Sequence, residues 1–338
     1  MTGHGLEAAG NFVRLVLYIW WVILQPCGAW WSRAGLSLLA ALAVGAACSS
    51  AADEVPAAAA VPAARPADLA GYQWRDVDGK PLPFQDHGAI LEALRSATVI
   101  SQEKIGRGVG GAEKLVLESG GRRFHAAFRS VDVTKRPPPT GGTTKPTMKY
   151  RDAAVFEVAA YELSELLGMG RVPPAVARSI GGKAGTVQIW MEGTTPEVVL
   201  VEREELQPPD QVRWRRQKQI MVVFDTLIAN TDRNQGNLLI DDRWNIWLID
   251  HTRAFRRTPD LLYVKRLDTC ERRLWTALVQ TDEDALLQAL EPHLERAEIV
   301  SLLQRRANLI RHFERLIKKQ GEDAVLFDLS PPGVGHAD

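Results

Sequence analysis

Apolar residues follow strand-like spacing in one part of the chain and helix-like spacing in another. Residues 114–117 and 123–129 have the pattern of short strands, and Gly120-Gly121 between them is typical of a tight turn. Residues 89–97 place apolar side chains on one side of a short helix, and residues 172–191 return to strands. The pattern predicts a small antiparallel sheet with one short helix.

Helical spacing dominates the remainder of the chain. Residues 151–168 and 211–230 carry apolar positions at helical intervals, whereas residues 131–150, with three consecutive prolines, are expected to form a loop. This order of elements predicts an α+β fold with a small β-rich part at about 98–193 and a helical part at about 209–328. The helical part is predicted to contain a hairpin over 238–249 and helices near 268–280, 284–293 and 296–319.

The first 48 residues differ in kind from the rest. Residues 33–48 begin with arginine, continue with an apolar stretch of about a dozen residues and end in small residues, which is the form of a secretory signal. The Ala-Ala-Cys end resembles a bacterial lipoprotein cleavage site, after which Cys48 would carry the lipid. Cleavage by an ordinary signal peptidase near Ala47 and an uncleaved membrane anchor are the alternatives. We therefore expect membrane association, with export to the periplasm or cell surface, or a cytoplasmic location behind an uncleaved anchor.

A second segment separates this leader from the folded region. Residues 49–70 are mostly alanine and proline with few charges, a composition expected of an extended tether. The folded region is predicted to run from 71 to 328, and the Pro/Gly-rich residues 329–338 are predicted to form a flexible tail.

Charge and cysteine content exclude some functions. Lysine plus arginine and aspartate plus glutamate number 41 each, so the formal net charge is zero. Binding a phosphate backbone requires an excess of cations, and the composition therefore argues against nucleic acid as a partner. Cys27 and Cys48 lie in the leader, and Cys270 is expected to be a structural thiol. No Cys/His spacing resembles a zinc site.

The densest polar signal is the segment Asn-Thr-Asp-Arg-Asn-Gln-Gly-Asn at 230–237, which is followed by the hairpin ending at Asp250. Apolar stretches flank it, so a loop held by rigid elements presents several donors and acceptors together. Phosphoryl transfer needs a carboxylate that orients the attacking hydroxyl and oxygen ligands for magnesium. Asp232, Asn237 and Asp250 can face one cavity, and Arg233 is expected to anchor the loop. A polar turn that caps a helix is the simpler alternative.

The motif Asp-Arg-Asn-Gln-Gly-Asn at 232–237, with Ile-Asp at 249–250, resembles the catalytic core of the atypical branch of the protein-kinase-like superfamily. That branch includes the phosphatidylinositol 3- and 4-kinases, the HipA-type kinases and the secretory-pathway kinases. The resemblance implies a two-lobed protein-kinase-like fold that uses ATP and Mg²⁺. It also implies that Asp232 is the catalytic base and that Asn237 and Asp250 bind the metal.

The resemblance extends less specifically into the β-rich part. The segment 106–111 would be the glycine-rich loop over the nucleotide phosphates, since glycines let backbone N–H groups approach closely. Arg129 falls where the family places its phosphate-pairing lysine, and arginine is planar and bulkier than lysine. Glu157 would be the helix glutamate that pairs with this cation. The glycines concerned are Gly106, Gly108, Gly110 and Gly111.

These features predict transfer of a phosphoryl group from ATP to a hydroxyl of a protein Ser/Thr, or of a lipid or small molecule. The alternative is a catalytically inactive pseudokinase that acts as a membrane-tethered nucleotide-binding or scaffold module, which Arg129 in the lysine position favours. A surface-anchored structural lipoprotein is a third interpretation. ATP is scarce outside the cytoplasm, so an exported domain would use another donor or lack catalysis. A run of basic residues after Asp250 (Arg253, Arg256, Arg257, Lys265 and Arg266) would meet an acidic substrate or phospholipid headgroups, or form a solvated face.

Overall fold

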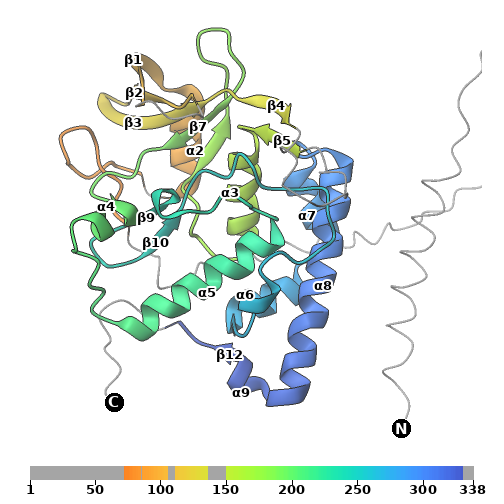
Figure 1. Ribbon diagram of the computed structural model, residues 1–338. Helices are drawn as coiled ribbons and strands as arrows, with labels where there is room; N and C mark the ends of the chain where they lie inside the picture. The colour runs from red at the N-terminus through yellow and green to blue at the C-terminus, as the bar shows by residue number, and fades with distance from the viewer. Residues whose placement is uncertain (1–71, 85, 106–110, 136–149, 330–338) are drawn as a thin grey trace, which may run out of the picture. The chain divides into compact units, whose positions relative to one another are not determined.

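The computed structural model describes residues 72–84, 86–105, 111–135 and 150–329 (Figure 1). The predicted leader at 1–48, with Cys48 as its predicted lipidation site, and the predicted linker at 49–70 lie outside these residues, as does the predicted tail beyond Leu329. No helix within the described ranges is long and apolar enough to cross a membrane.

A five-stranded sheet of order β1-β2-β3-β7-β6 forms the first part of the fold, and each neighbouring pair in it is antiparallel. Strands β2 and β3 alternate buried and more exposed positions, with Leu115, Leu117 and Phe124 among the buried ones, as the period of two requires. Helix α2 (His87–Ser96) contacts this sheet through β6 and β7. The strands are β1 Thr98–Lys104, β2 Glu113–Ser119, β3 Arg122–Arg129, β6 Ala175–Ala177 and β7 Thr186–Ile189.

A two-stranded ribbon corrects two of the sequence predictions. Strand β4 (Asp132–Lys135) lies where a loop was expected, and it pairs with β5 (Tyr150–Ala153), the first residues of the expected helix. Helix α3 therefore begins at Phe156 and ends at Leu166. The prediction placed the start of the helix too early: its apolar spacing begins at Val155, and the backbone of the residues before it pairs with β4. Pairing of two distant segments leaves no local periodicity in either one.

Helix α3 links the sheet to the helical part. It contacts β6 and β7 on one side and α7 on the other, and Figure 1 shows it near the centre of the fold. Helix α5 (Gln211–Leu227) begins at an N-cap, Asp210, whose side chain accepts a hydrogen bond from the backbone of Arg213. The other helices are α4 Glu197–Glu202, α6 Arg272–Gln280, α7 Glu283–Leu290, α8 Arg296–Gln320 and α9 Glu322–Val325, and β11 (Cys270–Glu271) pairs in parallel with β12 (Leu326–Phe327).

The predicted hairpin after the polar loop is present as β9 (Leu238–Ile240) and β10 (Ile246–Leu248), and β8 (Thr195–Pro196) adds a third strand. Its turn is closed by Asp241, whose carboxylate accepts hydrogen bonds from the backbone of Arg243 and Asn245 and from the indole N–H of Trp247. A buried carboxylate with this many donors fixes the turn and hence the end of β10.

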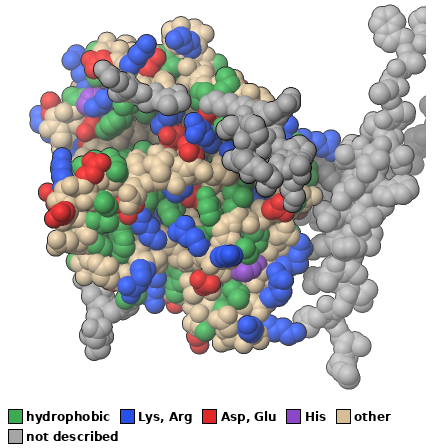
Figure 2. Space-filling view, in the orientation of Figure 1, with side chains coloured by type: hydrophobic (Ala, Val, Ile, Leu, Met, Phe, Trp, Pro, Cys, Tyr) green, Lys and Arg blue, Asp and Glu red, His purple; other side chains and the backbone are tan. Residues whose placement is uncertain are grey.

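Apolar side chains gather in two clusters. One contains residues of α2 and of the sheet, including Leu94, Leu117 and Phe128. The other is larger and joins α3 and α5 to the carboxy-terminal helices through residues such as Phe224 and Phe313. Figure 2 shows basic and acidic side chains interspersed on one face of the molecule, in keeping with the balanced composition.

Candidate active site

The loop after α5 is held by side-chain amides that bond to its own backbone. Asn230 Oδ1 accepts from the backbone N–H of Asp232 at 3.1 Å, and the Asp232 carbonyl accepts from Asn234 Nδ2 at 3.0 Å and Asn237 Nδ2 at 3.1 Å. Asn230 is fixed in turn because its Nδ2 donates to Asp225 Oδ1 at 3.0 Å. Asparagine forms such local bonds readily, so this asparagine-rich segment can hold the backbone of Asp232 in one position.

Arg233 anchors the loop from behind, as the sequence indicated. Its Nε and Nη2 donate to the Asp225 carboxylate at 2.9 and 3.0 Å, and its Nη1 donates to the carbonyls of Asn237 and Ile249 at 2.9 and 2.7 Å. Its Nη2 also lies 3.0 Å from His251 Nε2. The side chain is only 6% exposed, so these bonds are largely shielded from water. Arg233 therefore holds the loop and the end of the hairpin in a fixed relation.

Asn237 and Asp250, the two predicted metal ligands, are brought together by the hairpin. The backbone N–H of Ile249 donates to the Asn237 carbonyl at 3.2 Å, which places Asn237 beside the residue that precedes Asp250. Asn237 Nδ2 is turned toward Asp232, and no described residue bonds to its Oδ1. Asp250 has a φ of +61°, a left-handed conformation that is uncommon outside glycine and, at functional sites, is often maintained despite its strain.

The environment of Asp250 disfavours its charged form. Burial raises the pKa of the Asp250 carboxyl above its usual value; the nearby Arg129 guanidinium opposes this rise and the Glu157 carboxylate adds to it. A desolvated carboxylate with an incomplete counter-charge is a group that a divalent cation would stabilise.

Arg129 lies between Glu157, the partner that the sequence assigned to it, and Asp250. Its Nε is 3.7 Å from Glu157 Oε1 and its Nη1 is 3.5 Å from Asp250 Oδ1. Glu157 is fully buried on α3, and burial alone would raise the pKa of its carboxyl. Hydrogen bonds from His251 and the charge of Arg129 outweigh that effect and hold the pKa of Glu157 below its usual value.

His251 connects Glu157 to Arg233, a role that sequence reasoning missed. Its backbone N–H donates to Glu157 Oε1 and its Nδ1 lies against Glu157 Oε2, both at 3.0 Å. Arginine can only donate, so the contact with Arg233 requires a lone pair on Nε2, and the proton of the neutral ring then lies on Nδ1 and faces Glu157. The only sequence signal for this role is the position of His251 directly after Asp250.

The side chain of Asp232 is the most exposed of the predicted catalytic set, at 41%. Its Oδ2 accepts a hydrogen bond from Arg253 Nη1 at 2.9 Å, and no described residue bonds to Oδ1. One carboxylate oxygen is thus held by the protein, while the other can accept a proton from a hydroxyl.

Of the predicted glycine-rich loop, only Gly111 falls within the described residues, and Gly106, Gly108 and Gly110 lie outside them. Gly111 has a φ of +58°, which suits glycine, and it lies just before β2. The backbone N–H of Ile105 donates to the Ala112 carbonyl at 2.9 Å, so the ends of the segment are joined. In the order of elements the segment falls between β1 and β2.

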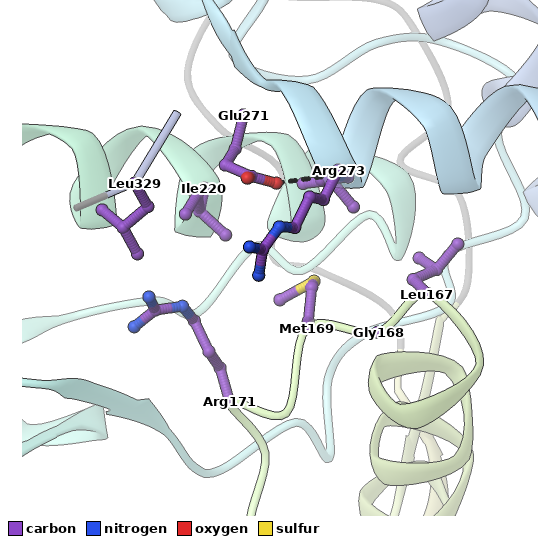
Figure 3. A pocket seen from close by; sticks show the side chains of 9 residues that line it. Leu167, Gly168, Met169, Arg171, Ile220, Glu271, Arg273 and Leu329 are labelled. Atoms are coloured by element: carbon purple, nitrogen blue, oxygen red, sulfur yellow. Dashed lines mark hydrogen bonds between the residues drawn. The ribbon is translucent and has the colours of Figure 1, made fainter. Parts of the chain in front are cut away.

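Two cavities lie elsewhere in the helical part. One of about 230 Å³ lies behind the polar loop, against α5 and Tyr263. The other, shown in Figure 3, has a volume of about 20 Å³, and Arg171, Glu271 and Arg273 are among its lining residues. None of the side chains predicted for catalysis or metal binding lines the second cavity, which has room for about one water molecule.

The oxygen donors suit a hard divalent cation. In the ranges that the structure describes, no three His, Cys, Asp or Glu side chains cluster in a way that would hold a metal ion. An amide oxygen of Asn237 and a carboxylate of Asp250 are the donors that Mg²⁺ accepts when phosphate and water oxygens complete its shell. The pair is therefore suited to a metal that arrives with a nucleotide.

Comparison with known proteins gives structural likenesses only. Neither a protein-family model nor a curated protein sequence matches this chain. A structure of hydra Fam20 with sugar aligns with a TM-score of 0.54 and 15% identity, covering 77% of this chain and 96% of that chain. A structure of the Golgi casein kinase aligns with a TM-score of 0.50 and 16% identity, covering 72% and 79% of the two chains. A second structure of that kinase, with Mn/ADP bound, aligns with a TM-score of 0.50 and 14% identity, covering 71% and 78%.

At these identities the likeness concerns the fold. It confirms that the described chain has a mixed helix and sheet fold like that of hydra Fam20 and the Golgi casein kinase.

Proposed function

We propose that this chain is an ATP- and Mg²⁺-dependent phosphotransferase that moves a phosphoryl group to a hydroxyl, with a protein Ser/Thr as the first candidate acceptor and a lipid or small-molecule alcohol as the second. The observation that carries the proposal is the arrangement of Asp232, Asn237 and Asp250 on one braced loop and hairpin, with a free carboxylate oxygen on Asp232. The kinase-like fold of the structural neighbours supports it, and one of them has Mn/ADP bound. In this proposal the sheet with α2 and α3 acts as the small lobe and the helical part as the large one.

Arg129 and Glu157 would serve nucleotide binding. Arg129 is 17% exposed and lies at the end of β3, where its guanidinium can contact a phosphate oxygen while Glu157 limits its movement. Glu157 is fixed by two hydrogen bonds from His251, so the arginine is held from a rigid helix rather than from a loop. Arginine at this position keeps the positive charge of the lysine that the resembling family has here, and its guanidinium can donate hydrogen bonds in more than one direction.

Asp232 would orient the acceptor. Its Oδ1 accepts a hydrogen bond from the acceptor hydroxyl, whose oxygen then faces the γ-phosphorus in line with the leaving oxygen of ADP. As the new O–P bond forms and the bond to ADP breaks, the hydroxyl proton passes to Asp232. Magnesium, held by Asn237 and Asp250, would supply the charge that neutralises the phosphate oxygens.

The test is transfer from γ-labelled ATP by the 338-residue chain, with Mg²⁺, to protein and to lipid or sugar-alcohol acceptors in separate reactions. Asp232→Asn keeps the shape of the side chain but not its basicity, so we expect transfer to fall at least about 100-fold. The label in a protein Ser/Thr would identify one acceptor class and the label in a lipid or small molecule the other. Full transfer by Asp232→Asn would refute the assigned role.

A pseudokinase is the second candidate, and a specific contact favours it. Arg129 pairs with Asp250 as well as with Glu157, so its guanidinium competes with a metal ion for the Asp250 carboxylate. The Arg129→Lys variant distinguishes an active kinase from a pseudokinase. If it increases Mg²⁺-dependent turnover, the arginine restrains an active enzyme; nucleotide binding without turnover in either protein would indicate a scaffold.

We also propose that the leader attaches this domain to a membrane, through lipidated Cys48 or through an uncleaved anchor. The proposal rests on the signal-like residues 33–48 and the Ala/Pro-rich tether that follows them. The mass of the amino-terminal peptide of the membrane-bound protein distinguishes the two attachments. An unmodified amino-terminal peptide that still contains residues before Cys48 would exclude the lipid.

A further inference from the structure

Arg253 joins the carboxylate of Asp232 to a second, buried carboxylate. Its Nη1 donates to Asp232 Oδ2 at 2.9 Å and its Nε donates to Asp152 Oδ2 at 3.3 Å. Asp152 lies on β5 and its side chain is 6% exposed, while that of Arg253 is 28% exposed. The guanidinium therefore links an exposed loop carboxylate to a buried strand carboxylate, two groups that are 80 residues apart in sequence.

The backbone brings Arg253 to this place. The N–H of Ala153 donates to the Thr252 carbonyl at 2.8 Å, so the segment after Asp250 runs beside β5. This bond sets Arg253 next to Asp152 by their adjacent positions in the two segments. The link thus begins at a rigid strand, and the arginine side chain carries it to the loop.

The basic residues that follow Asp250 in the sequence differ in their surroundings. Arg256 stacks on Tyr150, with its guanidinium carbon 3.7 Å from the ring centre, and bonds to Thr231 Oγ1 at 2.7 Å. Arg257 pairs with Glu295 and Glu298 on the side of α8. Arg253 is the member of the run whose described contacts include a carboxylate of the predicted catalytic set.

We infer that Arg253 is a positioning residue, which, with Asp152 as its anchor, fixes the rotamer of Asp232 so that Oδ1 faces the acceptor hydroxyl. The inference rests on the proposed function and adds a residue to it. The backbone of Asp232 is already fixed by the asparagine bonds, but its side chain could still rotate, and Arg253 supplies its one described side-chain hydrogen bond. An exposed carboxylate held on one oxygen keeps the other oxygen free in a defined direction.

The proposed role differs from that of an ordinary surface ion pair. An isolated exposed pair contributes little and can be lost without effect on a distant oxygen. Here a planar guanidinium bonds to one carboxylate through Nη1 and to another through Nε. The single ammonium group of a lysine cannot reproduce this geometry. Misplacing a reacting group by about 1 Å can cost about 100-fold in rate, so the position of Oδ1 matters more than the strength of the pair.

The experiment compares Arg253→Ala, Arg253→Lys and Asp152→Asn with the unchanged 338-residue chain, measuring ATP turnover with Mg²⁺ and KM for ATP. We expect Arg253→Ala to lower kcat about 100-fold with KM for ATP unchanged within about twofold, because Arg253 contacts neither Asn237 nor Asp250. Arg253→Lys and Asp152→Asn should give intermediate values. The matched control is Arg272→Ala: Arg272 is 33% exposed and also pairs with several carboxylates, on α9 and after β12, and its loss should leave kcat unchanged.

If the unchanged chain shows no turnover, the proposed function is refuted. A measurement of Tm then still tests the contact between Arg253 and Asp152. Arg253→Ala leaves the buried Asp152 carboxylate without this partner, so we expect a lower Tm, part of which Asp152→Asn restores in the double variant. Equal losses of Tm with and without Asp152→Asn would overturn the link between the two residues. Full kcat in Arg253→Ala, in an active protein, would overturn the positioning role.

Discussion

The Nδ1–H of His251 points at the carboxylate of Glu157 across 3.0 Å, and both side chains are fully buried. Arg233 approaches the opposite ring nitrogen, so the ring cannot reverse its donor and acceptor without placing two donors against each other. A continuous set of buried contacts therefore runs from the polar loop through His251 to α3 and Arg129. The relative position of the predicted metal ligands and of Arg129, the proposed phosphate-binding cation, depends on this set.

Glu157→Gln should destabilise the protein by about 3–5 kcal/mol, the usual cost of breaking a buried ion pair. Glutamine offers only one acceptor oxygen where His251 presents two donors, and it removes the charge that pairs with Arg129. Urea unfolding measures the change. Glu162→Gln on the same helix is the control: burial raises the pKa of Glu162, so its neutral replacement should not destabilise the protein. A loss below about 1 kcal/mol for Glu157→Gln would contradict the account.

Asp250→Asn should raise the Tm of the metal-free protein at neutral pH. Burial raises the pKa of Asp250 in the folded state, so the folded protein binds this proton more tightly than the unfolded chain does, and stability falls as the pH rises from about 3.8 through the folded pKa. Asparagine carries no charge and tolerates a positive φ. The difference in Tm between the two proteins, measured with a chelator present, should shrink as the pH falls toward 3.8. A pH-independent difference would show that charge is not the cause.

Gly185→Ala should destabilise the protein by about 1–3 kcal/mol. A Cβ at this position would clash with the carbonyl oxygen of Arg129 and lie 2.6 Å from the Phe128 ring, so β3 must shift at Arg129. We expect weaker nucleotide binding along with the lower stability. Lys183→Ala, at an exposed neighbouring position, is the control for chemical denaturation and for nucleotide titration. Unchanged stability would contradict this prediction, because it would mean that β3 can move away from residue 185 without cost.

Arg305→Ala should cost about 3 kcal/mol, since it leaves buried carbonyls without donors. Arg305 lies on α8, fully buried, and its guanidinium donates to the carbonyls of Leu227, Arg256 and Thr258. Burial lowers its pKa to about 10, which reflects the absence of a described carboxylate partner. These carbonyls lie at the end of α5 and after Asp250, so turnover should fall together with stability. Arg306→Ala, which bonds to carbonyls near the end of α6, should lower stability without this loss of turnover.

The polar loop and its hairpin could be predicted from the sequence because their residues are close together along the chain. The spacing of Asp232, Asn237 and Asp250 is local, and the asparagines that brace the loop lie within it. The same holds for β2 and β3, where alternation and a glycine turn are both visible in the sequence. The metal and catalytic roles assigned to these residues stay predictions.

Contacts between distant segments could not be read in this way. Strand β5 was predicted as helix because its pairing with β4 spans a segment of the chain that carries no matching pattern. Asp152 and Arg253 meet only because the backbone after Asp250 runs beside that strand, and the sequence shows Arg253 only as one member of a basic run. The partners that define the tautomer of His251 come from distant segments, so only the fold shows them.

The central claim is that Asp250 and Asn237 form a site for a nucleotide with its metal, and a thermal-shift titration of the 338-residue chain with ATP tests it most directly. A ligand that binds only the folded state stabilises it by about 2.7 kcal/mol at 100 times its Kd, so Tm should rise with ATP and Mg²⁺. The account predicts that this rise is small without Mg²⁺ and is lost in Asp250→Asn. No shift at millimolar ATP with Mg²⁺, or an equal shift in Asp250→Asn, would contradict it.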